Sequence, residues 1–325
     1  MKFTIAIPTY KAQYLRECIE SVLSQDYTNF EVVIVNDNSP QDIDSIVSSF
    51  ESDSRIRYYK NPVGFGGYNV VKNWNKCLNL ATGEYIICMG DDDKLSPSCL
   101  SNYLKLIEQH PALDVFHTRT LIINEESSVV DIQEPRPSFE SVYSMMWFLW
   151  KGRDQFIGDF LFRTKKLKDI GGFYFLPYAW SSDKITAFLM ASNKGIANTA
   201  SIGFLYRRSS ITITNSSKNQ IERYNALLQE RQWYFQFLKN ELRMTAHIDK
   251  DLYRLCHDNI DHYMQPQLRA MCFWDLQDNP KHIFYWLRNK NKCNFSGTTC
   301  IKMIFHSAKA VIYNIRHTIK RNRYV

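Results

Sequence analysis

Three consecutive aspartates, Asp91, Asp92 and Asp93, directly follow an apolar run that ends at Met89. Neighbouring carboxylates repel one another and raise one another's pKa, so a cluster without a counter-charge is unfavourable. A divalent cation removes that repulsion, and Mg²⁺ and Mn²⁺ prefer hard oxygen ligands. A solvated acidic turn is the alternative, but the position directly after a strand favours a metal site.

Asp37 is a second candidate and lies in the polar segment 36–39, Asn-Asp-Asn-Ser. An ionised carboxylate only accepts hydrogen bonds, so it can bind the N3–H of uracil and is repelled by the N3 lone pair of cytosine. The competing interpretation is an Asx turn or the N-cap of the next helix, and the residue taken alone favours that interpretation.

The elements that must position these residues alternate between two hydrophobic periods. Short apolar runs predict strands, and the segments between them repeat apolar residues at helical spacing. Strands that alternate with such helices form βαβ units, so we expect an α/β fold with a Rossmann-like, mostly parallel sheet flanked by helices. The predicted strands cover residues 3–8, 31–35, 55–59 and 85–89, with helices near 15–23, 43–50 and 70–78.

Ligands of such sheets bind beyond the carboxyl ends of the strands. Pro8, Thr9 and Tyr10 follow the first predicted strand, segment 36–39 follows the second, and the aspartates follow the strand at 85–89. We therefore expect all three segments to converge on one edge of the sheet.

Residues 1–215 are predicted to form one domain and residues 216–325 a helical C-terminal region. The chain's 325 residues favour about two domains. Its content of 45% hydrophobic and 14% aromatic residues excludes disordered, collagen-like and coiled-coil classes. From Gln220 onward the pattern is helical and aromatic, without strand signals.

Positive charge is concentrated at the C-terminal end of the chain. The whole chain carries a net charge of +7, yet beyond Asp278 it has ten basic residues and no acidic one. This distribution argues against a protein that binds nucleic acid over its whole surface.

The last predicted helix is amphipathic. Such a helix is typical of an element at an anionic membrane surface, and a helix that packs on the protein with a wet basic face is an equal alternative. Apolar residues on one arc of the wheel are Ile301, Ile304, Phe305, Ala308, Val311, Ile312, Ile315 and Ile319, and basic residues on the other are Lys302, Lys309, Arg316 and Lys320.

The cysteine pattern and the lack of long apolar runs predict a cytoplasmic protein. The eight cysteines form no Cys-x-x-Cys pair and no Cys/His cluster with zinc spacing. The first apolar run is too short for a signal peptide, and no run approaches the ~18 residues of a membrane span. The C-terminal helix makes the inner face of the plasma membrane a candidate peripheral location.

Taken together, these motifs resemble the pattern of glycosyltransferase family 2, whose members have the GT-A fold. The resemblance covers roughly residues 1–210, and the ordered set is far more specific than any single motif. It rests on residues 5–10, 33–39, 81–86 and 91–93.

The resemblance implies a nucleotide site. Pro8, Thr9 and Tyr10 are similar to the family's nucleotide-binding loop, which wraps the base and ribose. Asp37 matches the aspartate that contacts uracil, and Lys72 stands where the family often has an arginine, which makes it a candidate nucleotide contact.

The acidic cluster is similar to the family's DxD element, which holds ribose and metal. On this resemblance Asp91 is expected to contact the nucleotide, and Asp92 and Asp93 to bind Mn²⁺ or Mg²⁺. The chain departs from the commoner Asp-x-Asp-Asp form because Gly90 takes the place of the first aspartate.

Asp183 is the candidate catalytic base, since an acceptor hydroxyl must lose its proton in the transition state. It follows residues 171–173, Gly-Gly-Phe, which are similar to the family element upstream of a catalytic Glu-Asp pair, and Ser182 replaces the Glu. The alternative is a helix N-terminal residue favoured by the macrodipole. Arg207 and Arg208 lie in a segment similar to one near the donor diphosphate, where guanidinium groups pair with phosphate; a solvated basic turn is equally open.

The implied activity is inverting, metal-dependent transfer of a hexosyl or N-acetylhexosaminyl group from a nucleotide-sugar, with a UDP-sugar expected, to a hydroxyl acceptor. Family analogy and the basic C-terminal segment favour a lipid-linked glycan of bacterial surface polysaccharide, such as O-antigen or capsule, as acceptor. One alternative is a nucleotidyltransferase that releases pyrophosphate. The other is a catalytically silent partner that binds nucleotide-sugar or membrane. This alternative stays open because Ser182 and Gly90 stand where the family pattern has acidic residues.

Overall fold

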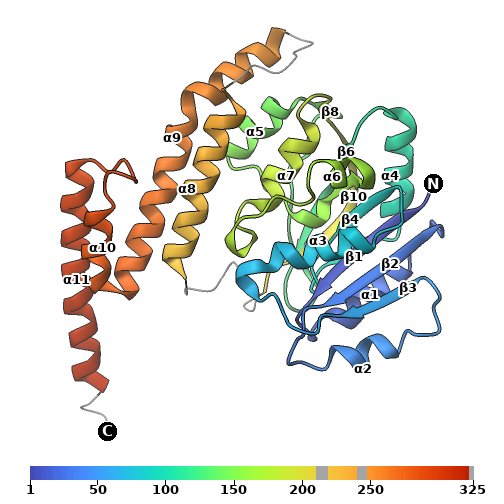
Figure 1. Cartoon of the computed structure of the whole chain (residues 1–325), viewed down its shortest axis with the longest axis horizontal. Helices are drawn as coiled ribbons and strands as arrows, with labels where there is room; N and C mark the ends of the chain where they lie inside the picture. Colours follow the sequence, from blue (N-terminus) through green and yellow to red (C-terminus); the bar gives the residue numbers. More distant parts are fainter. Residues whose placement is uncertain (210–218, 240–246, 322–325) are drawn as a thin grey trace. The chain divides into compact units, whose positions relative to one another are not determined.

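The computed structural model describes residues 1–209, 219–239 and 247–321, with side chains as far as residue 313. Strands and helices alternate over the first hundred residues, as the hydrophobic periods predict (Figure 1). The strands are β1 (Phe3–Thr9), β2 (Phe30–Asn36), β3 (Ile56–Lys60), β4 (Tyr85–Cys88), β5 (Lys94–Leu95), β6 (Val115–Ile123), β7 (Val129–Ile132), β8 (Phe139–Glu140), β9 (Phe160–Arg163) and β10 (Ile196–Arg207). The α-helices are α1 (Leu15–Leu23), α2 (Ile43–Ser48), α3 (Val70–Leu80), α4 (Cys99–Gln109), α5 (Val142–Trp150), α6 (Thr164–Asp169), α7 (Ser182–Ala191), α8 (Gln220–Phe237), α9 (His247–Asp278), α10 (Ile283–Arg288) and α11 (Gly297–Arg321).

The described strands form a ten-stranded sheet in the order β3-β2-β1-β4-β9-β6-β10-β5, with β7 added to β6 and β8 to β10. The pairs β1–β2, β1–β4 and β2–β3 are parallel, in agreement with the predicted βαβ units. Beyond β4 the sheet is mixed, because β9 runs antiparallel to both β4 and β6, whereas β6 and β10 are parallel. β9 has only four residues, too few for a hydrophobic period to identify it.

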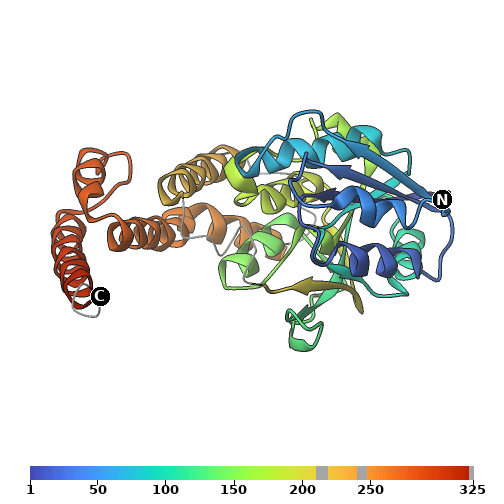
Figure 2. The same ribbon diagram turned by 90° about the horizontal axis from the view of Figure 1, so that it is seen from below.

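Helices lie on both faces of the sheet (Figures 1 and 2). The core on one face joins alternate residues of β1 and β2 to the apolar sides of α1, α2 and α4, while α3 packs on β1 and β2 from the other face. Since both faces are covered, β1 and β2 are almost continuously buried, which explains their unbroken apolar runs. The core between the sheet and helices α1, α2 and α4 includes Phe3, Ile5, Ile7, Leu15, Ile19, Val32, Ile34, Ile43, Val47, Leu100 and Tyr103.

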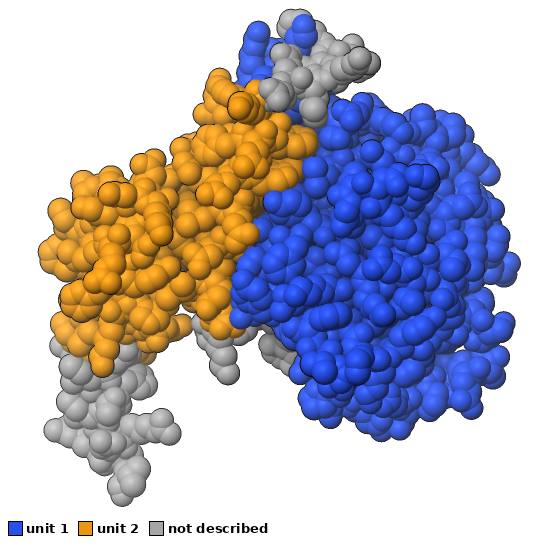
Figure 3. Space-filling model, viewed as in Figure 1, with its two compact units in different colours: residues 1–215, 240–256 blue, residues 216–239, 257–325 orange. Residues whose placement is uncertain are grey.

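The chain divides into two compact units, coloured in Figure 3. Unit 1 contains residues 1–215 and 240–256, and unit 2 contains residues 216–239 and 257–325. The sequence places a boundary near residue 215, which lies outside the described residues. Unit 2 is helical and has a core of its own, in which the fully buried Trp286 donates its indole N–H to Asp275 at 2.6 Å and packs edge-on against Tyr224.

The apolar arc predicted for the last helix does not pack against the rest of unit 2. Thr299, Met303, Ser307 and Ala310 are the buried residues among the described side chains of α11, whereas the arc is exposed along its described length. The exposed large residues are Ile301, Ile304, Phe305, Val311 and Ile312. The side chains of Ile315, Arg316, Ile319 and Lys320 lie outside the described part of the chain.

The eight cysteines form no disulfide, and seven of them are buried. Burial raises the pKa of the Cys77 and Cys88 thiols, so they behave as small apolar core residues. Along the described residues, none of the helices combines the length and the apolar character that crossing a membrane requires.

Candidate functional site

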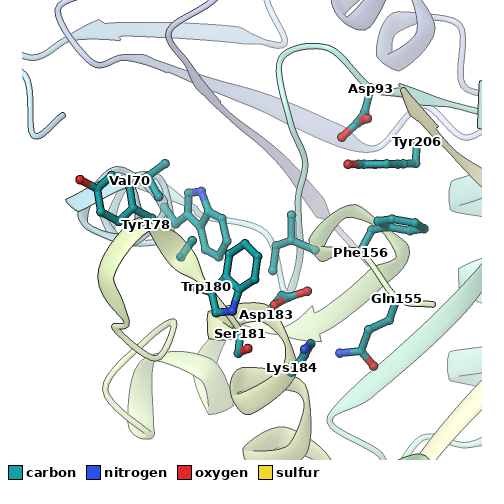
Figure 4. A pocket seen from close by; sticks show the side chains of 13 residues that line it. Val70, Asp93, Gln155, Phe156, Tyr178, Trp180, Ser181, Asp183, Lys184 and Tyr206 are labelled. Atoms are coloured by element: carbon teal, nitrogen blue, oxygen red, sulfur yellow. The ribbon is translucent and has the colours of Figure 1, made fainter. Parts of the chain in front are cut away.

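Two adjoining cavities lie at the carboxyl ends of the central strands, and Val70 lines both. The glycine-loop cavity, of about 400 Å³, is lined by Pro8, Thr9, Tyr10, Lys11, Gln13, Asp37, Gln41, Gly66, Gly67, Val70 and Asn73. The acidic cavity, of about 380 Å³, is lined by Val70, Trp74, Asp93, Gln155, Phe156, Ile157, Tyr178, Ala179, Trp180, Ser181, Asp183, Lys184 and Tyr206 (Figure 4). The predicted convergence of the strand ends is therefore present in the structure.

Asp91 holds the loop that follows β1. One of its carboxylate oxygens, Oδ2, accepts hydrogen bonds from the backbone N–H groups of Tyr10 and Lys11, both at 2.7 Å, and from the hydroxyl of Thr9 at 3.2 Å. Asp91 is buried and does not line the glycine-loop cavity. Its position therefore supports a role in shaping the loop after β1, and the direct nucleotide contact that the family pattern implies stays a prediction.

Asp37 holds a second loop, the glycine-rich segment 64–67. Its Oδ1 accepts from the backbone N–H of Phe65 at 2.8 Å and from the side-chain amide of Asn61 at 3.0 Å, and its Oδ2 accepts from Gly66 N–H at 3.0 Å. Oδ2 retains capacity for another donor, because a carboxylate oxygen has two lone pairs. Asp37 can thus fix the loop and still accept a hydrogen bond from a ligand in the cavity.

Lys72 and Asn73 are neighbours on α3 but point in different directions. Lys72 is exposed and does not line either cavity. Asn73 is buried, lines the glycine-loop cavity, accepts from Asn61 at 3.1 Å and donates to the carbonyl oxygen of Val35 at 3.0 Å. The structure favours Asn73 over Lys72 as the residue near a bound nucleotide.

Lys11 is a residue of the site that the sequence analysis did not identify, although it directly follows Tyr10. Its ammonium donates to Oδ2 of Asp92 and lies 3.5 Å from Oδ1 of Asp91. Burial disfavours the charged form, but the attraction of Asp91 and Asp92 outweighs burial and raises the pKa of Lys11. Lys11 therefore supplies part of the positive charge that the acidic cluster needs.

The remaining oxygens of the acidic cluster fit a divalent cation. Oδ1 of Asp92 and Oδ2 of Asp93 accept no hydrogen bond from any described residue, and a Cβ on Gly90 would stand only 2.9 and 2.7 Å from them. Any side chain at position 90 would therefore fill this space, which explains why the chain has glycine there. Burial, and next the charge of Asp92, raise the pKa of Asp93, so a bound cation would relieve a real electrostatic cost.

No three acidic, histidine or cysteine side chains among the described residues form a preformed metal cage. That arrangement is still compatible with Mg²⁺ or Mn²⁺, since such ions are commonly held by one or two carboxylates together with phosphate oxygens of the substrate. The residues that would hold a cation here are Asp92 and Asp93.

Asp183 and Asp93 face the same cavity (Figure 4). Asp183 lies in the first turn of α7, and the turn before it has left-handed backbone angles at Tyr178, Ala179 and Ser181, with φ of 57°, 55° and 67°. Such conformations are unfavourable for residues other than glycine and concentrate at functional sites. The turn thus stores strain at the place where it presents Asp183 to the cavity.

Ser182 has a structural contact at the position where the family pattern has a glutamate. It is fully buried, and its hydroxyl accepts from the backbone N–H of Leu176 at 3.1 Å. A glutamate would not fit this buried position without displacing that contact. Asp183 is consequently the acidic residue that α7 offers to the cavity.

Arg207 is fully buried, and its side chain is hydrogen-bonded to other residues of unit 1. Its Nε donates to the backbone oxygen of Asp92 at 2.8 Å, its Nη2 to Glu17 at 3.0 Å, and its Nη1 to Asn124, Glu125 and Ser127. A guanidinium with acceptors at all three nitrogens is poorly placed to pair with a diphosphate. Of the two arginines, the exposed Arg208 is the one that the structure leaves accessible.

Comparison with known proteins identifies a family. The model of the family described as "Glycosyl transferase family 2" matches residues 4–171. Among similar curated proteins is a Campylobacter jejuni GalNAc(5)-diNAcBac-PP-undecaprenol beta-1,3-glucosyltransferase, 29% identical over 258 residues that span 78% of this chain and 79% of the relative. A putative colanic acid biosynthesis glycosyl transferase of Escherichia coli, WcaA, is 38% identical over 31% of this chain and 36% of its own.

Solved structures share the fold. Residues 1–349 of S. aureus TarS in complex with UDP-GlcNAc superpose with a TM-score of 0.63 at 16% identity, over 95% of this chain and 92% of the other. A Pyrobaculum calidifontis mannosyltransferase in complex with GDP-Man and Mn²⁺ gives a TM-score of 0.52 at 14% identity, over 96% and 86%. The predicted α/β fold, with its helical C-terminal region, is therefore confirmed.

Proposed function

The chain belongs to glycosyl transferase family 2 and is a glycosyltransferase, and on that basis we propose that it transfers one sugar from a UDP-sugar to a hydroxyl acceptor with inversion at the anomeric carbon. Its relatives include bacterial proteins named for an undecaprenol-linked glycan, for colanic acid biosynthesis and for poly(ribitol-phosphate). Inversion corresponds to a single direct displacement without a covalent sugar–enzyme intermediate.

The observation that carries the proposal is the pair of adjoining cavities that share Val70. The glycine-loop cavity would take the nucleotide, with residues 8–10 around the base and ribose. Asp37 would accept the N3–H of uracil on Oδ2, a contact that cytosine does not offer. The acidic cavity would then receive the sugar, between Asp93 and Asp183.

Asp183 would act as the base in the displacement. The acceptor hydroxyl gives its proton to the Asp183 carboxylate while its oxygen bonds to the anomeric carbon, and the bond from that carbon to the diphosphate oxygen breaks. UDP leaves with the electron pair of the broken bond. Arg208 is the candidate for pairing with the departing diphosphate.

Asp92 and Asp93 would hold Mn²⁺ or Mg²⁺ through the two oxygens that carry no hydrogen bond. The chemistry that such a cation supplies is neutralisation of the negative charge that grows on the leaving diphosphate. Lys11, bound to the other oxygen of Asp92, would keep the cluster compensated before the donor arrives.

We propose a lipid-linked glycan as the acceptor, at the cytoplasmic face of the membrane. The C. jejuni relative is named for an undecaprenol-linked substrate. In unit 2, the exposed apolar residues of α11 lie beside basic ones, a combination that suits an anionic lipid surface.

The direct test of the base is Asp183→Asn, compared with Asp131→Asn on the exposed strand β7. Asp183→Asn should lower transfer by a factor on the order of 10²–10⁴ while the affinity for UDP stays within about threefold. Asp131→Asn should match wild type in both. Analysis of the released product also decides the reaction class, since a nucleotidyltransferase would liberate pyrophosphate and a silent partner would liberate nothing.

A further inference from the structure

Gln155 is a buried amide that faces the acidic cavity (Figure 4). It is 9% exposed, and neither its amide nitrogen nor its amide oxygen has a hydrogen-bond partner among the described residues. Buried polar groups in folded proteins are nearly always hydrogen-bonded, so each exception requires an explanation.

The backbone on both sides of Gln155 is fixed. The carbonyl oxygen of Asp154 accepts from the side chains of Gln133 at 3.3 Å and Arg136 at 3.1 Å. On the other side, Phe156 N–H donates to Asp159 at 3.1 Å, and the Phe156 ring stacks on Tyr206 with centroids 3.9 Å apart. The backbone that carries Gln155 is therefore fixed at the cavity wall.

An amide held in this way suits a sugar ring. It offers two N–H donors and one carbonyl acceptor, which match neighbouring hydroxyl groups or a hydroxyl next to an acetamido group. The same cavity has aromatic walls from Trp180, Phe156 and Tyr206, and ligand sites typically combine such apolar surfaces with a few polar groups that fix orientation.

We propose that Gln155 is a specificity-determining residue that hydrogen-bonds hydroxyl or acetamido groups of the sugar ring in the acidic cavity. This proposal rests on the transferase function proposed above and adds the contact that selects the sugar. A site built to hydrogen-bond a substrate hydroxyl discriminates strongly against an analogue that lacks it, because its own polar group is then left unpaired.

The test compares Gln155→Leu with Gln133→Leu. Gln133 is a buried glutamine close by whose amide is fully engaged: its Oε1 accepts from Thr120 N–H at 3.0 Å, and its Nε2 donates to Asp159 at 2.8 Å. The leucine at 155 removes an amide without a partner, so the melting temperature should stay equal or rise. The leucine at 133 breaks hydrogen bonds, so the melting temperature should fall.

Activity gives the second readout. With UDP-glucose and UDP-N-acetylglucosamine, hydrolysis by water measures the donor alone, and transfer to p-nitrophenyl glycosides adds an acceptor ring. Gln155→Leu should lower kcat/KM about tenfold or more, the fold-change expected for loss of a buried hydrogen bond to substrate. A loss in hydrolysis assigns the contact to the transferred sugar; a loss confined to the KM for the glycoside assigns it to the acceptor.

An unchanged kcat/KM in the Gln155→Leu variant would overturn the proposal, and so would a fall in melting temperature equal to that of Gln133→Leu. Both results presuppose a wild-type protein that uses the donor. If wild type neither hydrolyses nor transfers from these two donors or from any other UDP-hexose or UDP-N-acetylhexosamine, the proposed function itself fails, and the two failures are thereby distinguished.

Discussion

The backbone N–H of Arg207 donates a hydrogen bond to Oδ1 of Asp93 at 2.8 Å, although the two residues are 114 positions apart. The same arginine donates from Nε to the carbonyl oxygen of Asp92 at 2.8 Å, and its guanidinium lies 4.1 Å above the Tyr14 ring. Arg207 thus connects the end of β10 to the loop of residues 91–93 through its backbone N–H and through its side chain.

Replacement of Arg207 by methionine should therefore damage both folding and activity. The substitution removes the donor to the buried carbonyl oxygen of Asp92 and to the partly buried ones of Asn124 and Glu125, and loss of one partner in a buried charged network costs about 3 kcal/mol. Urea unfolding should show this loss as a lower free energy of unfolding. A transfer assay should show a reduced kcat. Arg208→Met is the matched control for stability: because Arg208 is exposed, its free energy of unfolding should stay within about 0.5 kcal/mol of the wild-type value. Equal stability losses in both variants would contradict this assignment.

Gly64 should be required for nucleotide binding. A Cβ at this position would stand 2.5 Å from the backbone oxygen of Asp37, so Gly64→Ala must displace the loop that Asp37 holds. We expect UDP affinity, measured by calorimetry, to fall about tenfold, since forced overpacking typically costs about 1–3 kcal/mol. Gly297→Ala, where no heavy atom lies within 4 Å of the added Cβ, should leave the affinity unchanged. A Gly64→Ala variant with wild-type affinity would argue against the placement of the nucleotide.

His117 should make the protein less stable as the pH falls. Burial, and next the charge of Arg136, lower the pKa of His117 to about 4. Below the ordinary value near 6.5 the unfolded chain binds a proton that the folded chain does not, so this stability is lost between about pH 6.5 and 4. The shift corresponds to about 3 kcal/mol.

The comparison for His117 is with His117→Phe, because other groups also titrate in this range. The difference in unfolding free energy between wild type and variant should change by about 3 kcal/mol from pH 7 to pH 4. Parallel pH profiles for the two proteins would show that His117 is not buried in its neutral form.

The exposed apolar residues of α10 and α11 should bind anionic lipid. Phe284 and Phe305 are 77% and 65% exposed, and Lys281, Lys302 and Lys309 carry positive charge in the same segments. Substitution of both phenylalanines by serine should weaken flotation with phosphatidylglycerol vesicles about tenfold or more, given the apolar area removed. The control is Phe235→Ser in α8. Binding that survives the double substitution would exclude this surface as the membrane contact.

The parallel strands and the position of the site followed from the sequence, because buried strands read as apolar runs and ligands gather at their carboxyl ends. Asp93 and Asp183, 90 residues apart by number, were expected at one site and line one cavity. What linked them was the ordered family pattern, since neither residue alone distinguishes a functional acid from a solvated one.

The orientation of single side chains could not be predicted in this way. Adjacent helix residues point about 100° apart, so the pattern that identified Lys72 could not say whether it or its neighbour Asn73 faces the cavity. Lys11 and Gln155 can be recognised only from their surroundings, which are the carboxylates of Asp91 and Asp92 for Lys11 and the absence of a described hydrogen-bond partner for Gln155. Arg207 was expected either to pair with the donor diphosphate or to lie in a solvated turn, and the structure instead buries it among tertiary contacts.

Calorimetric titration of UDP, GDP, CDP and dTDP, each with Mn²⁺ or with EDTA, tests most directly whether the glycine-loop cavity is a uridine-nucleotide site. We predict that UDP binds most tightly. EDTA or Asp92→Ala should weaken UDP binding about tenfold or more, because the contact between the cation and the diphosphate is lost; a tenfold change in affinity corresponds to about 1.4 kcal/mol. The comparison with EDTA is easier to interpret, because Asp92→Ala also removes the hydrogen-bond partner of Lys11. Preference for GDP, or no binding of any nucleotide by folded wild-type protein, would contradict the account.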